Sequence, residues 1–451
     1  MRSAGLRLDQ APPLDIPLRF LLTGPLFGAA AGIYLAAKGA VLLSSPFHPE
    51  TIALAHLVAL GWISMVMVGA LYQLLPVAVG VPVKGIRLGR WVHAGLVLGT
   101  AALAVGLVWD SGVALALAIA SLAAAFGTVL VQLWLALASV PSVTPTVTSI
   151  RLAAVSLGAV FVLGLLFAGE HLIGWYPAQR ATLVGVHILF AFGGWIGGLI
   201  TGVSYVVVPM FYLAAPFPGR TTRLVSMALS VALLVGLIAL ISGPLAQSAG
   251  ATFFWEALAG RWMWIALPAV ALATAVYSGT WIRLVLRRRR KAADATLWLW
   301  RIGLAAVGAA LVLLGASELE PSSRWLVGFG AVYLVGFGGS IELGMSYKIV
   351  PFLVWLHRFG RRAADPTTPL VRDLLSDSAA RRQALLHLSA VILLGAAALV
   401  PPEWPTRGRL TGNVLTPDVL ARCAGITLAL SCGTAFLLLI RATWRGRQVK
   451  D

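Results

Sequence analysis

The sequence predicts an all-α, polytopic membrane protein with twelve transmembrane helices. Of its 451 residues, 59% are hydrophobic and only 11% are charged, a composition outside the range of soluble domains. The charged residues are crowded between long apolar runs, and about 20 such residues cross the roughly 30 Å of hydrocarbon in a bilayer. A block that recurs in three of these runs indicates an internal repeat. We therefore expect the lipid bilayer to be the main partner of this chain.

Twelve apolar segments are long enough to span the membrane. They lie near 18–43, 53–76, 91–109, 112–139, 150–169, 183–213, 223–243, 262–286, 297–315, 325–353, 384–400 and 418–440. The polar stretch that precedes them lacks the hydrophobic core and the cleavage site of a signal peptide. We therefore expect the first span to be retained.

Spans two, six and ten share one pattern at one spacing. GALYQLLP ends at Pro76, GVSYVVVP at Pro209 and GMSYKIVP at Pro351, with Gly, Tyr and Pro at identical offsets. A Gly followed by an aromatic residue precedes each block, and an Arg opens the hydrophobic run before it. We interpret residues 1–451 as a single transmembrane domain of three four-helix repeats, near 17–139, 150–286 and 297–440. A pseudo-threefold axis normal to the membrane would relate them.

The basic residues are segregated by loop, which predicts the orientation. The N-terminus, the even-to-odd loops and the C-terminus carry 26 of the 34 Lys and Arg, and the other loops carry six. By the positive-inside rule both termini are cytoplasmic, as expected for a protein of a bacterial-type inner membrane. The net charge of +18 therefore does not indicate nucleic acid, and the run from Arg283 to Lys291 is interpreted as an anchor at anionic headgroups.

The two cysteines carry no metal or redox motif. Cys423 and Cys432 are nine residues apart on one span, which places them on opposite faces of a helix and excludes a disulfide between them. The sequence contains no CxxC, no CxxCH and no cysteine-rich zinc pattern.

Histidines and acids gather at the outer side of the predicted topology. His48 and Glu50 lie in the first loop, His56 lies just inside span two, Glu170 and His171 follow span five, and His187 opens span six. The remaining histidines, His93, His357 and His387, are expected at the cytoplasmic interface. Imidazole is a common ligand of haem iron, copper and zinc. Hydrogen bonding across helices is the structural alternative for His56 and His187.

Span six combines a histidine with small residues. His187, Gly194 and Gly198 lie close to whole turns apart, so they share one face, and Gly202 continues it as GxxxGxxxG. Such a face allows either close helix packing or contact with a flat cofactor. The repeat tyrosines of spans two and six, Tyr72 and Tyr205, are further candidates for cofactor contact.

Span ten lacks a histidine but carries Glu342 and Lys348. An ionisable residue inside a membrane is costly and is by default a candidate for function. Glu342, Lys348 and Glu170 are therefore candidates for a proton or ion pathway. The ordinary alternative for Glu342 is an ion pair with Lys38 or Lys348.

The block HLVALGWISMVMVGALYQLLPV, together with twelve spans in three units, resembles subunit I of the haem-copper oxidases and the related NnrS family. The resemblance covers nearly the whole chain. It implies that His56 matches the span-two ligand of the low-spin haem and that His187 corresponds approximately to the span-six copper ligand. The family's histidines in spans seven and ten are absent here, and position 191 is Ala instead of the tyrosine found in many oxidases. The resemblance therefore does not imply a complete binuclear centre.

The sequence favours a protein that binds haem b, with copper as an alternative metal, through His56 and His187, with His48 and His171 as further metal ligands. Its role would be electron transfer or a response to nitric oxide or oxygen, with a redox partner or another respiratory subunit. Two other classes fit the same residues: a cofactor-free transporter that uses the polar groups of span ten, and a structural subunit of a respiratory complex. The sequence gives no catalytic residue and leaves open whether the protein is an enzyme.

Overall fold

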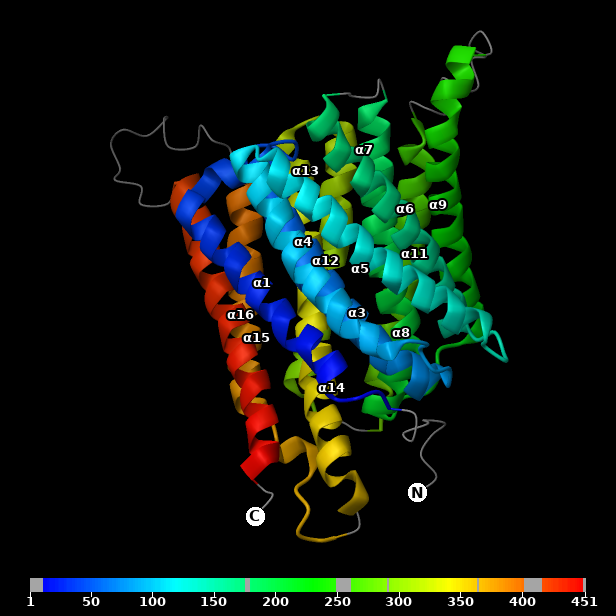
Figure 1. Cartoon of the computed structure of the whole chain (residues 1–451), viewed down its shortest axis with the longest axis vertical. Coiled ribbons are helices and arrows are strands. Elements are labelled where there is room, and N and C mark those ends of the chain that lie inside the picture. The colour runs from blue at the N-terminus through cyan, green and yellow to red at the C-terminus, as the bar shows by residue number, and fades with distance from the viewer. Residues whose placement is uncertain are drawn as a thin grey trace. The chain divides into compact units, whose positions relative to one another are not determined.

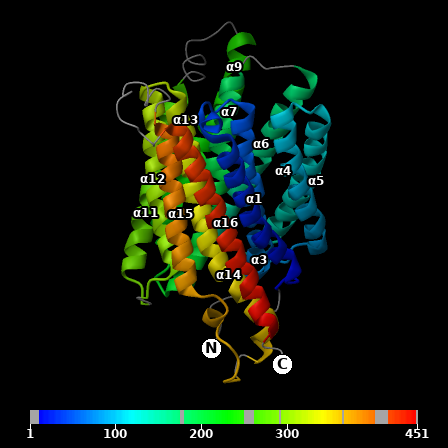
Figure 2. The ribbon, with the colours of Figure 1, turned by 90° about the vertical axis from the view of Figure 1, so that its left-hand side faces the viewer.

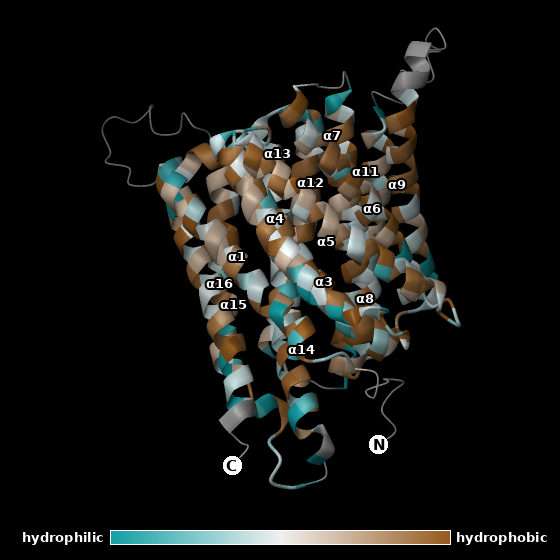
Figure 3. Ribbon diagram, in the orientation of Figure 1, coloured by the Kyte–Doolittle hydropathy of each residue, from teal (hydrophilic) through white to brown (hydrophobic). Residues whose placement is uncertain are grey.

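The computed structural model describes residues 11–174, 179–248, 261–289, 292–362, 365–400 and 416–448. These residues form helices and connecting loops, without a strand among them. Twelve of the helices are long and apolar enough to cross a membrane, which confirms the predicted number of spans and the membrane class. Apolar residues cover the helices along most of their length (Figure 3).

The first six spans run from Asp15 to Tyr212. They comprise α1 (Asp15–Lys38) with η2 (Gly39–Leu43); α2 (Pro49–His56), η3 (Leu57–Ser64), α3 (Met65–Leu74) and η4 (Leu75–Val79); η5 (Ile86–Leu88) with α4 (Gly89–Trp109); α5 (Gly112–Ala138); α6 (Pro145–Ile173); and α7 (Arg180–Ile188), η6 (Leu189–Gly197) and α8 (Gly198–Tyr212).

The last six spans begin at Gly219. They comprise α9 (Gly219–Ser248); α11 (Met263–Leu286); α12 (Ala295–Leu319); α13 (Ser323–Ala331), η7 (Val332–Gly339) and α14 (Ser340–Phe359); α15 (Asp377–Leu399); and α16 (Pro417–Gln448). Two short 3-10 turns, η8 (Gly360–Arg362) and η9 (Val371–Asp373), follow α14.

Polar caps extend several helices beyond their apolar runs. The side chains of Thr144, Asp294 and Ser376 accept hydrogen bonds from the first turns of α6, α12 and α15, which satisfies backbone N–H groups that have no partner within the helix. As a result α15 begins at Asp377, not near residue 384 as hydropathy predicts. Hydropathy detects only the apolar part of a helix, and the polar first turns escape it.

The chain packs as two compact units. The central unit comprises Leu74–Gly85 and the described residues from Ala123 to Arg289. The terminal unit comprises Pro12–Gln73, Ile86–Leu122 and the described residues from Ala292 to Gln448. The central unit thus holds most of the second predicted repeat, and the terminal unit holds most of the first and third.

In the terminal unit the first and last spans pack tightly together. Figures 1 and 2 show α1, α16 and α15 side by side. A Cβ atom on Gly32 would lie 2.5 Å from the backbone nitrogen of Ala429, and Gly425 makes the reciprocal contact with Ala36. Small residues therefore bring the two backbones into direct contact.

Two ends of the terminal unit can be told apart by their contacts. At one end, His357 at the end of span ten bonds Pro12, and Arg358 bonds the carbonyl oxygen of Thr443 near the end of span twelve. At the other end, Asp418 at the start of span twelve accepts a hydrogen bond from the backbone of Ala40, just after α1. The described residues before span one and after span twelve therefore share one end of this unit, as the predicted topology requires.

The central unit has an apolar core between α6, α7, α9 and α11. Val186, Phe190 and Leu233 are buried in it together with Trp262. Gly236 of α9 allows close packing, since a Cβ atom there would lie 2.9 Å from Leu189.

Spans two, six and ten each contain a π-helical segment before the repeated block, and these are η3, η6 and η7. Span two has a second one, η4, that begins within the block. Each of these three widened segments ends twelve residues before the proline of the repeated block. A π turn is rare and is frequent at functional sites. The sequence repeat is thus accompanied by a repeated backbone feature, which the residue pattern did not predict.

The glycine that lies eight residues before each block packs against the preceding span. A Cβ atom on it would lie closer than 3.0 Å to that neighbour, and the pairs are Gly61 with Phe27, Gly194 with Ser156, and Gly336 with Ala306. Eight residues later the contacts recur one level along the same helices, as Gly69 with Phe20, Gly202 with Ser149, and Gly344 with Leu299. The partners within each preceding span are seven residues apart in all three cases, so the packing register also repeats.

Candidate functional site

His56 lies at the last residue of α2, immediately before the widened segment η3. Its Nδ1 atom is 2.8 Å from the carbonyl oxygen of Ile52, one turn earlier. A carbonyl can only accept, so Nδ1 carries the proton and Nε2 is the nitrogen with the lone pair. A hydrogen bond from the nitrogen that does not bind metal fixes the ring of a ligating histidine. His56 therefore has the tautomer that an axial ligand needs.

His48 and Glu50 flank the start of the same helix. His48 is the N-cap residue of α2, and its Nδ1 atom is buried without a hydrogen-bond partner among the described residues. Glu50 forms an ion pair with Lys38, with a Nζ to Oε1 distance of 2.8 Å. Glu50 is thus paired with a cation, whereas Nδ1 of His48 makes no hydrogen bond to the described residues.

His187 packs against span five in the central unit. Its ring lies edge-on to Phe167, with centroids 5.5 Å apart, and its Cε1 atom lies 3.7 Å from the position of a Cβ on Gly164. His56 belongs to the terminal unit. A ligand site shared by His56 and His187 therefore stays a prediction.

The glycine face of span six is used for helix packing at two of its three levels. Gly194 lies against Ser156 and Gly202 against Ser149, both on α6, which explains both glycines by packing, while cofactor contact at Gly194 stays a prediction. Gly198 differs, because a Cβ atom there would meet only the carbonyl oxygen of Gly193, at 3.6 Å. The sequence could not show which of the three glycines pack against another helix, since all three share one face.

The repeat tyrosines cannot share a cofactor with the histidines of their own spans. His56 and Tyr72 are sixteen residues apart on continuous helix, which at 1.5 Å per residue is about 24 Å, most of the bilayer core. Tyr72 is buried against Phe20, with ring centroids 5.6 Å apart, and Tyr205 against Phe217, at 5.1 Å. Both tyrosines therefore belong to aromatic packing near the other end of the span.

The sequence suggested that Glu170 lies at the outer surface, but the structure buries it. Its side chain is fully buried, and Arg180 donates to its Oε2 atom at 2.9 Å. His171 follows it at the last turn of α6. The ion pair joins the end of span five to the start of span six, so Glu170 has a structural explanation.

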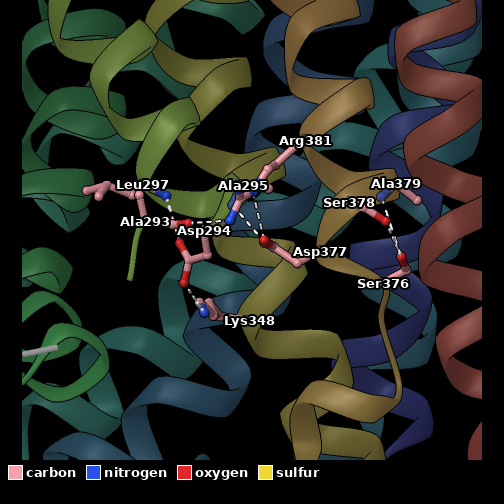
Figure 4. Close-up of polar contacts among 10 residues, drawn as sticks. All are labelled: Ala293, Asp294, Ala295, Leu297, Lys348, Ser376, Asp377, Ser378, Ala379 and Arg381. Carbon is pink, nitrogen blue, oxygen red and sulfur yellow. Dashed lines mark hydrogen bonds and ion pairs between the residues drawn. The ribbon is translucent and has the colours of Figure 1, made fainter. Parts of the chain in front are cut away.

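Lys348 belongs to a polar network at the starts of spans nine and eleven (Figure 4). Its Nζ atom lies 2.6 Å from Asp294, and the other carboxylate oxygen of Asp294 caps α12 through the backbone of Leu297. Asp377 accepts from the backbone of Ala295 at 2.9 Å and from Arg381 at 2.8 Å. The network ties spans nine, ten and eleven together at one end of the terminal unit.

Glu342 is therefore not paired with either lysine that the sequence offered. Lys38 bonds Glu50 and Lys348 bonds Asp294. The residue is only 5% exposed, and neither carboxyl oxygen has a hydrogen-bond partner among the described residues. The alternative in which Glu342 pairs with Lys38 or Lys348 is thus wrong.

His387 was expected at the interface, but it lies fully buried, ten residues into α15. Nδ1 is 3.2 Å from the hydroxyl of Ser431 on α16, and Nε2 is 3.1 Å from that of Ser340 and 3.2 Å from the carbonyl oxygen of Val335. Hydropathy set the start of span eleven too late and so misplaced this residue. The polar cap at Ser376 was the signal that could have corrected it.

The other two histidines also make structural contacts. His93 Nε2 lies 2.9 Å from the hydroxyl of Thr23 on α1. His357 bonds the carbonyl oxygens of Leu353 and Pro12 through its two ring nitrogens, both at 3.0 Å. These contacts explain His93 and His357 without any cofactor.

The fold and these contacts define a polytopic, all-helical membrane protein with polar side chains buried between its spans. No family model matches the chain, and no curated protein is significantly similar to it. Within the described residues, no three His, Cys, Asp or Glu side chains are grouped closely enough to hold a metal ion.

Proposed function

We propose that this chain is a membrane protein of the oxidase subunit I type that binds haem b, with His56 as the axial ligand. The observation that supports this best is the hydrogen bond from His56 Nδ1 to Ile52, which directs the lone pair to Nε2. A bound haem would supply one-electron transfer or the binding of a diatomic gas. Electron transfer or a response to nitric oxide or oxygen would follow, with copper as the alternative metal.

The donor set of the terminal unit fits one axial ligand. His357 and His387 have both ring nitrogens in hydrogen bonds, and His93 is bonded to Thr23. Of the histidines in this unit, His56 is assigned as the axial ligand because of its bond to Ile52, and His48, at the start of the same helix, is a second donor. A second axial ligand would come from His187, from His48 or from another chain, and without one the iron would keep a position open for a gas.

The repeat architecture is part of the proposal. The three widened segments, their shared distance to the proline and the recurring glycine contacts support three related four-helix units around a pseudo-threefold axis.

The proposed orientation places both termini in the cytoplasm of a bacterial-type inner membrane. It is supported by the segregation of the basic residues, 26 of which lie in the segments assigned to the cytoplasmic side and six in the other loops, since the positive-inside rule counts Lys and Arg.

The test is the visible spectrum of the protein purified in detergent from cells supplied with haem precursor, with metal analysis. A Soret band is expected, and His56→Ala should remove most of the haem, because only apolar contacts would then hold it. His93→Ala is the matched control, since it removes a histidine of the same unit that bonds only Thr23 among the contacts described above. Full haem content in His56→Ala, or a preparation without haem or copper, would rule the proposal out.

His187→Ala separates two roles within the same experiment. If His187 is the second ligand, its loss converts a six-coordinate spectrum into a five-coordinate one that binds carbon monoxide more readily. If it only lines the pocket, coordination stays and gas affinity changes.

A second candidate function, transport of a small ion without any cofactor, is favoured by one observation. Glu342 is a buried carboxyl group without a partner in the described residues, and such groups mark ion pathways in membranes. A colourless, metal-free preparation that moves protons in proteoliposomes, and loses this activity in Glu342→Gln, would favour transport over haem binding. A colourless preparation without transport would favour a structural subunit.

A further inference from the structure

Glu342 lies in the most deeply buried of the described spans. Span ten, Ser323–Phe359, has 83% of its most apolar window buried, and Glu342 stands near its middle. The residue is 5% exposed, and both Oε1 and Oε2 are buried without a hydrogen-bond partner in the described residues. A carboxyl group in such a place must be either ionised without compensation or neutral.

Three basic residues of the terminal unit bond other acids. Lys348, six residues further along the same helix, bonds Asp294, and Arg381 of α15 bonds Asp377. Lys38 of α1 bonds Glu50. None of these three cations is therefore available to form an ion pair with Glu342.

The helix geometry turns Glu342 away from the polar groups of α15. Successive residues of a helix are about 100° apart, and Ser340 faces His387 while Ile341 faces Gly303 of α12. Glu342 therefore projects about 200° from Ser340, toward neither His387 nor α12. The buried histidine network cannot supply a proton donor or a positive charge to this carboxyl group.

Other unpaired polar groups lie in the same unit. Gln73 on α3 has both amide atoms buried without a partner, and the hydroxyl of Tyr347 and Nε1 of Trp62 are in the same condition among the described residues. Buried polar groups in native proteins are nearly always satisfied, by ordered water or ions where protein partners are lacking. The interior of the terminal unit thus contains several polar side-chain atoms that are not hydrogen-bonded to other described residues.

We propose that Glu342 is a proton-binding site within the membrane, at which the carboxyl group is held as the neutral acid. An ionised carboxylate in an apolar interior forfeits its hydration without any compensating bond, whereas a neutral acid forfeits far less. The proton is therefore the ligand that this environment selects. The site does not depend on haem binding, and it is expected in a colourless preparation as well.

The test uses dicyclohexylcarbodiimide, an apolar reagent that reacts with protonated carboxyl groups. The acid proton moves to a carbodiimide nitrogen and the carboxylate oxygen adds to the central carbon, so the peptide gains the mass of one reagent and nothing is lost. The purified protein at neutral pH is treated with the reagent, digested and mapped by mass spectrometry. We expect the adduct on the peptide that contains Glu342, and none on that peptide in Glu342→Gln.

Glu170 is the internal control. It is as deeply buried as Glu342, but it is ion-paired with Arg180, which lies 2.9 Å from its Oε2 atom, so its peptide should remain unmodified in the same sample. Equal labelling of both peptides would show that burial alone decides the reaction, and no adduct at Glu342 would show that the acid is ionised. Either result overturns the proposal.

Two further measurements distinguish a bound proton from a bound metal cation and from an ionised acid with a partner. Sodium chloride and potassium chloride should leave the adduct yield unchanged, and suppression by sodium alone would assign the site to a metal cation instead. Glu342→Gln should melt within a few degrees of the natural protein, because the amide reproduces the shape of a neutral acid. A large loss of stability would mean that an ionised Glu342 holds a partner, which the proposal excludes.

Discussion

The imidazole of His387 in α15 reaches the carbonyl oxygen of Val335, inside the widened segment η7, at 3.2 Å. Its other nitrogen lies 3.2 Å from Ser431 of α16, whose hydroxyl also accepts from Gln383 at 2.9 Å. A fully buried histidine thus joins spans ten, eleven and twelve through bonds that are each strengthened by the apolar surroundings.

Replacing His387 should therefore destabilise the terminal unit. His387→Ala leaves the hydroxyl of Ser431 short of a partner and opens a cavity, and we expect a loss of about 2–4 kcal/mol in the free energy of unfolding. The measurement is reversible unfolding in mixed micelles. His357→Ala, at the end of a helix, should lose less, and equal effects of the two substitutions would contradict the network's role.

The two glycines of span six that share a face should respond in opposite ways. Gly194→Ala places a methyl group against Ser156 and should cost about 1–3 kcal/mol through overpacking. Gly198→Ala has ordinary contacts only and should be neutral or gain up to about 1 kcal/mol of helix propensity. Melting temperatures of the two variants check this. A haem loss in Gly198→Ala without a loss of stability would instead place the cofactor against that glycine.

The ion pair of Lys348 and Asp294 should show energetic coupling. Their side chains are 20% and 16% exposed, so solvent screens the pair less than at a surface. A double-mutant cycle with Lys348→Met and Asp294→Asn should give a coupling of about 1–3 kcal/mol. Asp294→Asn keeps an acceptor for the cap of α12. A coupling near zero would show that the contact does not contribute to the free energy of unfolding.

The orientation can be tested with truncated reporter fusions. Alkaline phosphatase after Ser45 should be active, because the positive-inside rule places this loop outside, and green fluorescent protein after Ala293 should fluoresce in the cytoplasm. The reversed reporters serve as controls. If both positions report the same side, the order of twelve spans or the orientation is wrong.

The sequence alone determined the membrane class, the number of spans and the segregation of charge. These follow from composition along the chain, because the bilayer selects apolar length wherever it occurs. The repeated Gly, Tyr and Pro are visible in the sequence, but the widened segments that lie at one distance from Pro76, Pro209 and Pro351 were found only in the structure.

Only the tertiary structure decided which polar residues are left without partners. Glu170 and Glu342 are both acids in apolar surroundings by sequence, yet one meets Arg180 and the other meets no cation among the described residues. His387 is likewise satisfied by Ser431 and Val335, which come from distant parts of the chain. Hydropathy is a property of neighbouring residues, whereas the pairing of a buried polar group depends on helices that the fold brings together from far along the chain.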